Sequence, residues 1–491
     1  MCRERRARSD NAENDCFVSY GGTYGRVSRI ISGPLKPDAV NQAVPSARAV
    51  EKILQQQAEG RAIAEDDSER RLYRKVILRI IPFIFVCYVL NYIDRVNVSF
   101  AKLQFKDDLS LTDASYGLGV GLFYIGYILF EVPSNLLLQR IGARKTITRI
   151  MCLWGLVSMA MAFVSTPAEF YLARILLGVA EAGFFPGIIL YLTFWFPNRL
   201  RGRVMSFFVL AIAVSGVVGG PISGLIMQQL GGLLGFKSWQ WLFLIEGMLP
   251  VMMGIAAFFV LDDGPREAAW LSSSEKDRLA VNLAIKSRIE SHSGIQAFLS
   301  SLGKPMLWMA TFGYFSITWA GTVLNFWTPT IIQRSGITGI FQVGLLSAVP
   351  YAVGAVGMLA VCYNSDRLLE RHRHFFATVF VAGCAAVAIA YSTWSSSLSI
   401  VCLALLAVGY LSAIALFWTI PTGFLSESES PGGLAFISSV GQIGSLVAPV
   451  LFGYVAERTG SLTMGASVVA LVLFAGGCAV LSLRFFPQSQ G

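Results

Sequence analysis

Hydrophobic positions along the chain are gathered in long runs that short polar segments separate. From Ile77 onward these runs recur almost to the end of the sequence. Each is about as long as the roughly 20 apolar residues that a helix needs to cross a bilayer. Such runs show neither the alternation of a strand nor the wide polar face of a surface helix. The pattern therefore predicts membrane-spanning helices.

The apolar runs predict twelve spans in two groups of six. The first six are expected at residues 77–99, 115–138, 146–165, 168–191, 204–229 and 240–261, and the last six at 306–332, 341–363, 375–394, 397–424, 432–456 and 463–486. Between the groups, a mixed-charge segment at 274–278 suits an amphipathic surface helix. We therefore predict an all-α membrane protein with a six-helix bundle at 76–261, a cytoplasmic linker at 262–305 and a second six-helix bundle at 306–486.

The two ends of the chain differ from this pattern. Residues 1–75 hold fourteen Lys or Arg and eleven Asp or Glu, and they contain no apolar run of ten residues. This composition is typical of a disordered tail, although residues 50–74 suit a polar helix that precedes the membrane. The first thirty residues also lack the apolar core of a signal peptide. We expect a largely disordered tail at 1–75 and a short tail at 487–491.

Composition excludes an ordinary soluble protein and gives no sign of a cofactor. Hydrophobic residues make up 54% of the chain, charged residues 14%, and the mean hydropathy is +0.59, whereas soluble domains are about 25% charged. The eight cysteines stand singly without a CxxC pair, so we interpret them as packing residues. All three histidines fall in predicted loops, and no GxxxxGK motif is present. We expect no metal, no cofactor and no use of ATP.

Basic residues set the expected orientation. The net charge of +9 could suggest nucleic acid, but Lys and Arg lie mainly in loops between apolar runs. With the amino terminus inside, short cytoplasmic loops hold ten of them, and the outer loops hold five: Lys102, Lys106, Lys237, Arg334 and Arg458. Cytoplasmic loops usually carry this excess. We therefore expect a multi-pass protein of the bacterial inner membrane with both termini in the cytoplasm and no nucleic-acid partner.

Ionisable residues inside a span are costly and usually functional. Asp94 and Arg95 lie in the first predicted span, and Arg174 and Glu181 in the fourth. Seven residues are nearly two helical turns, so Arg174 and Glu181 share a stripe about 10 Å apart and each needs a partner elsewhere. We expect Asp94 to pair with Arg174, which leaves Arg95 and Glu181 facing a cavity. A buried ion network that only holds the bundle together is the alternative.

Two further acids are interpreted as structural. Glu131 lies close to the basic loop that follows its span, where it can form a salt bridge to Arg140 or Arg144. Glu246 follows the segment WQWLFLI near the outer surface, so we expect it at the edge of the bundle.

The second half of the chain has polar faces instead of buried charges. In the seventh span four residues recur at i, i+4, i+7 and i+11, which places them on one helix face: Tyr314, Thr318, Gly321 and Asn325. A similar polar lining is offered by Trp418, Thr419 and Thr422 around Pro421, and by Ser438 and Gln442. These groups can bind the hydroxyls of a solute or, alternatively, bond between helices.

At residues 91–101, NYIDRVNVSFA, the chain resembles the major facilitator superfamily and, within it, the anion:cation symporter branch. Four further segments agree: FYIGYILFEVPSN at 123–135, RILLGVAEAGFFPG at 174–187, WQWLFLIEG at 239–247 and FWTIPTGFLS at 417–426. The resemblance covers about residues 75–486. It implies proton-driven uptake of a small organic anion such as tartrate, a sugar acid or an aromatic acid.

The resemblance also implies roles for single residues. It assigns Arg95 to the solute carboxylate, Glu181 to the proton, and Arg174 to a pair with Asp94. The expected solute-binding residues are Arg95, Tyr124, Tyr314, Asn325, Trp418 and Gln442, and the expected proton-coupling residues are Asp94, Arg174 and Glu181. Many relatives carry asparagines where this chain has Ser438 and Gln442, so the groups that face the solute differ.

Three other functions compete with the uptake of an organic anion. A membrane-embedded enzyme needs a nucleophile, a metal site or an acid–base pair near an interface, and the sequence shows none, so we expect no enzyme. A non-transporting sensor and drug efflux on the same fold remain alternatives, although Arg95 and Arg174 suit anions better than cationic drugs. We expect a monomeric secondary active transporter that moves a small carboxylate with protons by alternating access.

Overall fold

The structure is a computed structural model, and it describes residues 47–287, 299, 301–391, 395–425 and 429–486. Within these residues all regular structure is helical. The described chain divides at residue 70 into two units, and the second unit contains all twelve predicted spans.

The first half of the chain forms helices that match the first six predicted spans. They are α2 (Ala47–Asp108), α3 (Asp113–Ile141), α4 (Ala143–Ala160) with the 3₁₀ turn Met161–Phe163, α5 (Pro167–Glu181), α6 (Phe184–Thr193), α7 (Asn198–Gln229) and α8 (Ser238–Val260). The fourth span is broken into α5 and α6. The linker contains α9 (Ser273–Ser287), which confirms the helix expected around residues 274–278.

The second half repeats this arrangement. Its helices are α11 (Pro305–Phe326), α12 (Thr328–Arg334), α13 (Ile340–Leu368), α14 (Arg371–Tyr391), α15 (Ser396–Phe417), α16 (Ser430–Gly441), α17 (Ile443–Thr459) and α18 (Leu462–Ser482). In the described part of the chain, 11 helices are long and apolar enough to cross a membrane. The seventh predicted span, α11, is not among these 11, because polar residues such as Thr318, Thr322 and Asn325 lower its hydropathy. It nevertheless occupies the expected place.

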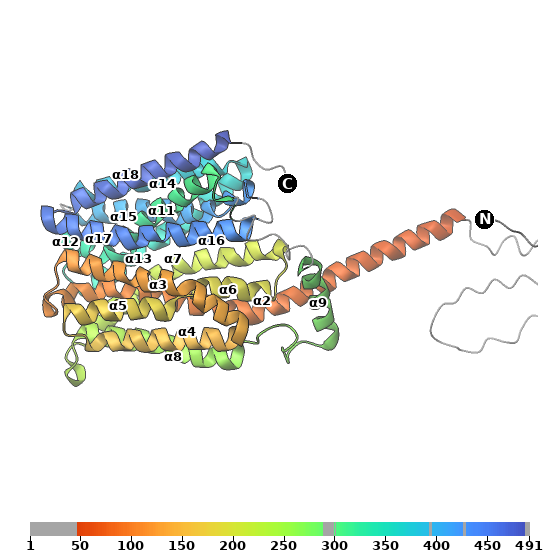
Figure 1. Cartoon of the computed structure of the whole chain (residues 1–491), viewed down its shortest axis with the longest axis horizontal. Helices are drawn as coiled ribbons and strands as arrows, with labels where there is room; N and C mark the ends of the chain where they lie inside the picture. Colours follow the sequence, from red (N-terminus) through yellow and green to blue (C-terminus); the bar gives the residue numbers. More distant parts are fainter. Residues whose placement is uncertain (1–46, 288–298, 300, 392–394, 426–428, 487–491) are drawn as a thin grey trace, which may run out of the picture. The chain divides into compact units, whose positions relative to one another are not determined.

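The two halves meet along two pairs of helices. Helix α7 packs on α13, and α3 packs on α17 (Figure 1). Small residues allow this close approach: a Cβ on Gly220 of α7 would lie 2.6 Å from the carbonyl oxygen of Gly344 on α13. The interface between the halves is therefore tight where these helices cross.

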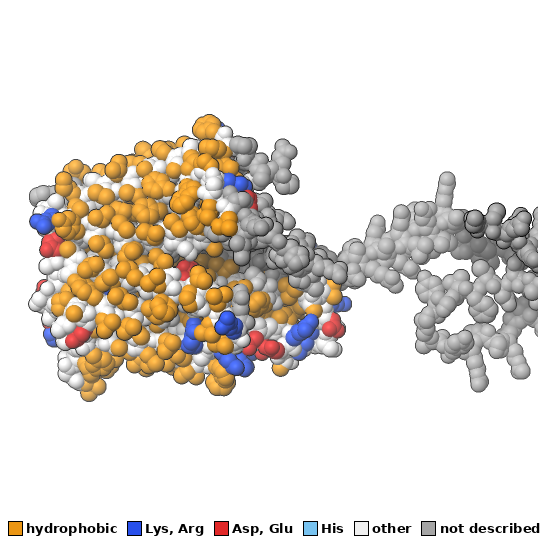
Figure 2. Space-filling model, viewed as in Figure 1, with side chains coloured by type: hydrophobic (Ala, Val, Ile, Leu, Met, Phe, Trp, Pro, Cys, Tyr) orange, Lys and Arg blue, Asp and Glu red, His pale blue; other side chains and the backbone are white. Residues whose placement is uncertain are grey.

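Figure 2 shows that hydrophobic side chains cover the helical body, whereas charged side chains gather mainly near its two ends. Exposed apolar residues such as Leu129, Phe259 and Leu471 are 65%, 78% and 69% accessible. An aqueous surface rarely has so large an apolar area. The chain is therefore a multi-pass membrane protein.

The break between α5 and α6 follows from one glycine. Gly183 has φ +83°, a left-handed conformation that glycine adopts without steric cost. A Cβ at this position would also lie 2.5 Å from the Ser134 side chain of α3. The break places Glu181 at the end of α5, inside the membrane-spanning body.

The tail differs partly from the sequence-based expectation. A largely disordered tail was expected through residue 75, with a polar helix at 50–74. Residues 47–75 belong to α2, which includes that helix, and Leu72, Tyr73 and Val76 are buried. Buried apolar residues thus extend the first span toward the amino terminus. Residues 1–46 and 487–491 lie outside the described residues.

The start of α9 is held by Lys75, whose ammonium lies 2.9 Å from the Glu275 carboxylate. This contact lowers the pKa of Glu275. Six cysteines in the described part of the chain are free thiols, whereas Cys2 and Cys16 lie outside it.

Candidate functional site

Arg95 of α2 and Glu181 of α5 form an ion pair within the first half. Their side chains are 12% and 1% exposed. The guanidinium carbon of Arg95 also lies 5.3 Å from the ring centre of Phe123 and 5.5 Å from that of Tyr127, which are cation–π distances. The two residues were expected to face a cavity unpaired. They are instead each other's partner.

Arg95 opens onto a cavity of about 410 Å³ that both halves line. The lining residues are Tyr92, Arg95 and Tyr124 from the first half, and Tyr314, Ile317, Thr318, Gly321, Thr322, Asn325, Phe326, Tyr410, Ile414, Gln442 and Ser445 from the second. Five of the six residues expected to bind solute thus lie around one space.

The sixth expected residue, Trp418, does not line this cavity. Its ring centre lies 4.9 Å from that of Tyr314, so it supports a lining residue instead. The face of α11 predicted from the sequence is present, since Tyr314, Thr318, Gly321 and Asn325 all line the cavity.

The second half supplies amide groups at the cavity wall. The Asn325 side-chain oxygen accepts a 2.8 Å hydrogen bond from Tyr351, and the Gln442 side-chain oxygen accepts one of 2.8 Å from Ser445. Because these two bonds use the amide oxygens, the side-chain NH₂ groups of Asn325 and Gln442 remain as hydrogen-bond donors. These donors suit a ligand that is rich in acceptor oxygens.

The expected pair of Asp94 with Arg174 is not formed. Asp94 accepts hydrogen bonds from Ser158 of α4 and from Asn97, the latter at 3.1 Å. Successive helical residues diverge by about 100°, so Asp94 faces α4 while Arg95 faces α5. Helical spacing alone had suggested the wrong partner.

Arg174 is fully buried and binds a backbone oxygen. Its Nε donates to the carbonyl of Gly119 at 3.4 Å, and its guanidinium carbon lies 5.0 Å from the Phe123 ring centre. Neither Nη atom has a hydrogen-bond partner within the described chain. A positive charge is therefore held behind the same phenylalanine that contacts Arg95.

Glu131 and Glu246 also differ from expectation. Glu131 makes no ion pair within the described residues, and Oε2 of its carboxylate has no hydrogen-bond partner there. Arg144, one of its expected partners, lies over the Phe258 ring instead. Glu246 is not at the bundle edge: it is 2% exposed and accepts a 2.7 Å hydrogen bond from Ser223.

Several lining residues were not predicted from the sequence, most clearly Tyr92 and Tyr410. Their hydroxyl oxygens lie 3.5 Å apart across the two halves. Tyr92 could have been found, because it precedes Arg95 by three residues and shares its helix face. Tyr410 lies in a helix that is apolar on all sides, so the hydrophobic pattern does not predict which face lines a cavity.

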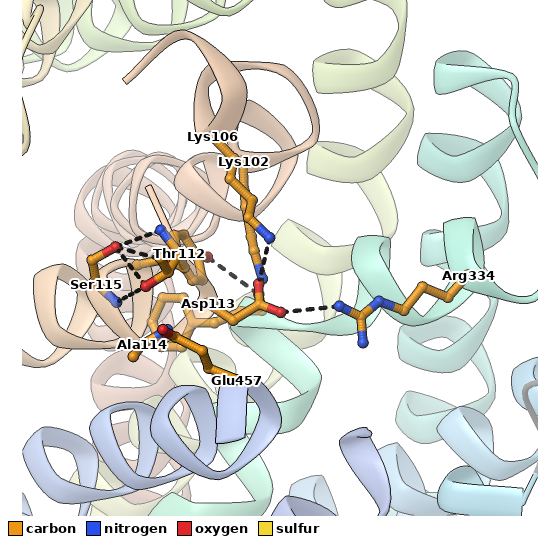
Figure 3. Close-up of polar contacts among 10 residues, drawn as sticks. Lys102, Lys106, Thr112, Asp113, Ala114, Ser115, Arg334 and Glu457 are labelled. Carbon is orange, nitrogen blue, oxygen red and sulfur yellow. Dashed lines mark hydrogen bonds and ion pairs between the residues drawn. The ribbon is translucent and has the colours of Figure 1, made fainter. Parts of the chain in front are cut away.

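Charged side chains from both halves meet at the end of the body where α2 joins α3 (Figure 3). The Asp113 carboxylate lies 3.0 Å from Lys102, 3.2 Å from Lys106 and 3.0 Å from Arg334 of α12. Glu457 of α17 accepts a 3.0 Å hydrogen bond from the backbone of Ala114. Contacts between the halves thus join them at this end.

Lys102 was expected in an outer loop, but the structure buries it. It is 3% exposed, and its ammonium lies 3.6 Å from the Trp327 ring centre. Helix α2 extends past the predicted span to Asp108, which draws this lysine into the interface between the halves.

Comparison with known proteins agrees with this architecture. A family model described as Major Facilitator Superfamily matches residues 84–449. A solved structure titled as a bacterial homolog of the human lysosomal transporter Spinster, inward-facing and unoccupied, covers 84% of this chain and 94% of its own, with a TM-score of 0.65 and 18% identity. That likeness concerns the fold alone.

Three curated relatives are similar over most of the chain. "Putative metabolite transport protein NicT" of Pseudomonas putida is 41% identical, covering 85% of this chain and 94% of the relative. "Putative tartrate transporter" of Agrobacterium vitis is 40% identical, with 87% and 98% covered. "Quinolone resistance transporter" of Acinetobacter baumannii is 39% identical, with 84% and 94% covered. All three are named as transporters and none as an enzyme. The chain therefore belongs to the Major Facilitator Superfamily, and it is a membrane transporter of that family and not an enzyme.

Proposed function

We propose that this transporter takes up a small organic carboxylate together with protons across the bacterial inner membrane, by alternating access and with both termini in the cytoplasm. The observation that carries the proposal is the Arg95–Glu181 ion pair at the wall of a polar cavity shared by both halves. Similarity to a relative named for tartrate supports an organic anion as the solute.

The ion pair supplies a coupling mechanism. A guanidinium can bind a carboxylate through two parallel hydrogen bonds. In this structure the Arg95 guanidinium is paired with the Glu181 carboxylate, so it is not available to a solute. Protonation of Glu181 removes its charge and releases Arg95 for the carboxylate of the solute. When Glu181 loses its proton, it competes for Arg95 again and the solute leaves. A buried charge without a partner is costly, so binding of proton and anion becomes linked.

Other lining groups give the proposed site its selectivity. The amides of Asn325 and Gln442 and the hydroxyls of Tyr124 and Tyr314 are placed to bind hydroxyl or further carboxyl groups of the solute. Arg174 adds a second positive charge behind Phe123. The cavity therefore favours small polar anions over neutral or cationic molecules of the same size.

Residues outside the binding wall take positioning roles in this proposal. Asp94 fixes α2 against α4 through Ser158, which orients the neighbouring Arg95 toward the cavity. Trp418 supports the ring of Tyr314. The proton itself is assigned to Glu181.

Uptake into proteoliposomes tests the proposal. The purified chain is reconstituted and supplied with labelled tartrate, a sugar acid, phthalate or 4-hydroxyphenylacetate. We expect accumulation of at least one acid under an inward proton gradient and its loss with a protonophore. Accumulation that follows sodium, or that ignores the proton gradient, would contradict the proton coupling.

Drug efflux is the second candidate. It is favoured by the relative named as a quinolone resistance transporter and by five aromatic lining residues, Tyr92, Tyr124, Tyr314, Phe326 and Tyr410. Expression in a drug-sensitive host separates the two functions. Efflux predicts reduced quinolone accumulation in cells, whereas acid uptake leaves it unchanged.

A further inference from the structure

Glu246 of α8 is a buried acid that does not line the Arg95 cavity. Its residue is 2% exposed, one carboxylate oxygen accepts from Ser223 of α7 at 2.7 Å, and Oε2 has no hydrogen-bond partner within the described chain. None of the described salt bridges includes it. A carboxylate ion without a cation is unfavourable in such surroundings, whereas a protonated carboxyl is tolerated.

Ser223 connects Glu246 to a second cavity between the halves. This cavity has a volume of about 330 Å³. Its polar lining comes from Asn97, Ser215 and Ser223 in the first half and from Thr328, Ser347 and Tyr351 in the second. It lies along the contact of α7 with α13, one of the two helix pairs that join the halves. Relative motion of the halves must therefore change its access to water.

The two cavities are separate but linked. No described residue lines both of them. Tyr351 lines the second cavity, and its hydroxyl donates to Asn325, which lines the Arg95 cavity. One hydrogen bond therefore joins the walls of the two spaces.

The groups around Glu246 leave it without a compensating cation. Asp94 approaches it from α2, and Asn97 beside Asp94 faces the second cavity. From α7 its neighbour is Ser223. On α4, Gly155 and Met159 pack against the neighbouring Gly247, and Ser158 donates to Asp94. None of these groups carries a positive charge that would compensate a Glu246 carboxylate.

We propose that Glu246 is a second proton-binding residue of the transport cycle and exchanges its proton with the second cavity through Ser223. The step is the reversible addition of one proton from water to the carboxylate, with release to water on the other side. The inference rests on the proposed proton-coupled function. It adds one proton, and one positive charge, to each transported anion.

Infrared difference spectroscopy between acid and alkaline pH tests the binding of this proton on the full chain in lipid, without any solute. A protonated carboxyl has a carbonyl band that a carboxylate lacks. Among the carboxyl bands that titrate in the wild type, we expect one to be lost in Glu246→Gln and to return, shifted, in Glu246→Asp. Glu275→Gln, which removes a paired surface acid, should leave the band unchanged. A spectrum that Glu246→Gln does not alter would overturn the proposal.

The charge moved per anion tests its part in transport. We expect Glu246→Gln proteoliposomes to keep solute exchange and to carry one positive charge fewer per anion than the wild type, measured with the best-transported acid of the panel above. An unchanged ratio would refute the role of Glu246 while leaving proton coupling intact. If no variant, including the wild type, responds to a proton gradient, the proposed function itself is wrong and the infrared result alone decides whether Glu246 binds a proton.

Discussion

The carboxylate of Asp113 on α3 and the guanidinium of Arg334 on α12 lie 3.0 Å apart, and they join the two halves of the transporter. The same carboxylate also contacts Lys102 and Lys106 of the first half (Figure 3). One acid thus gathers three cations at a contact between the halves. Under the alternating access proposed above, this contact holds the cavity closed here and breaks when the cavity opens.

Asp113→Asn should shift the transporter toward opening at this end. The change removes the charge that holds Arg334 against the first half, and it leaves three cations to repel one another. A cysteine introduced as Thr322→Cys on the cavity wall reports the opening. We expect a membrane-impermeant thiol reagent, added outside, to label it several-fold faster in the Asp113→Asn background.

The matched control is Glu457→Gln, which weakens a second contact between the halves, to the backbone of Ala114. We expect a smaller increase in labelling, because Gln can still accept that hydrogen bond. Equal labelling of all three proteins would show that Asp113 does not hold this end closed.

Arg95→Lys should weaken binding of the transported acid. A lysine ammonium cannot reproduce the two parallel bonds of a guanidinium, and loss of a charge-assisted hydrogen bond costs about 1.5–3 kcal/mol. We therefore expect Kd to rise by one to two orders of magnitude, measured by calorimetry on purified protein. Arg149→Lys is the control, since Arg149 bonds Ser134 away from the cavity. Unchanged affinity in Arg95→Lys would favour a purely structural ion network.

The sequence predicts the fold more completely than the site. Span positions follow from local hydrophobicity, which is why all twelve predicted spans overlap helices and why the break at Gly183 only divides one of them. The polar face of α11 was also predicted correctly, because residues on one helix keep a fixed angular relation.

Contacts between helices could not be predicted in this way. Spacing places Arg174 and Glu181 on one stripe, but it does not fix how α5 is rotated relative to α2. The expected partner of Arg174 was therefore wrong, and Glu181 binds Arg95 instead. Glu246 was misplaced for the same reason, since its depth along α8 says nothing of whether it faces lipid or α7.

Gly183→Ala should destabilise the first half. The alanine would need φ +83° and would place its Cβ 2.5 Å from the Ser134 side chain. Strain of this kind costs about 1–3 kcal/mol. Gly232→Ala separates the two effects, because Gly232 has φ +82° but a Cβ added there would meet no atom within 4 Å. We expect a larger drop of melting temperature in detergent for Gly183→Ala, and equal drops would mean that the contact with Ser134 is unimportant.

Glu181→Gln should separate solute exchange from accumulation. The amide imitates a protonated Glu181, so it cannot hold Arg95 as an ion pair, and Arg95 stays available to the solute at every pH. Binding should therefore become less dependent on pH, and it should exceed wild-type binding most at alkaline pH, where the wild-type ion pair competes best.

Transport by the same variant should lose its driving force. Exchange of labelled for unlabelled solute needs only that the loaded cavity turn from one side to the other, which Glu181→Gln permits. Accumulation needs a proton to enter with the solute and leave inside, and at Glu181 the amide carries none. We therefore expect counterflow near the wild-type rate and little uphill uptake, measured on one proteoliposome preparation. A structural Glu181 predicts loss of both activities together, because the buried Arg95 would lose its only ionic partner within the described residues. Full uphill uptake by Glu181→Gln would show that the proton is carried elsewhere in the chain.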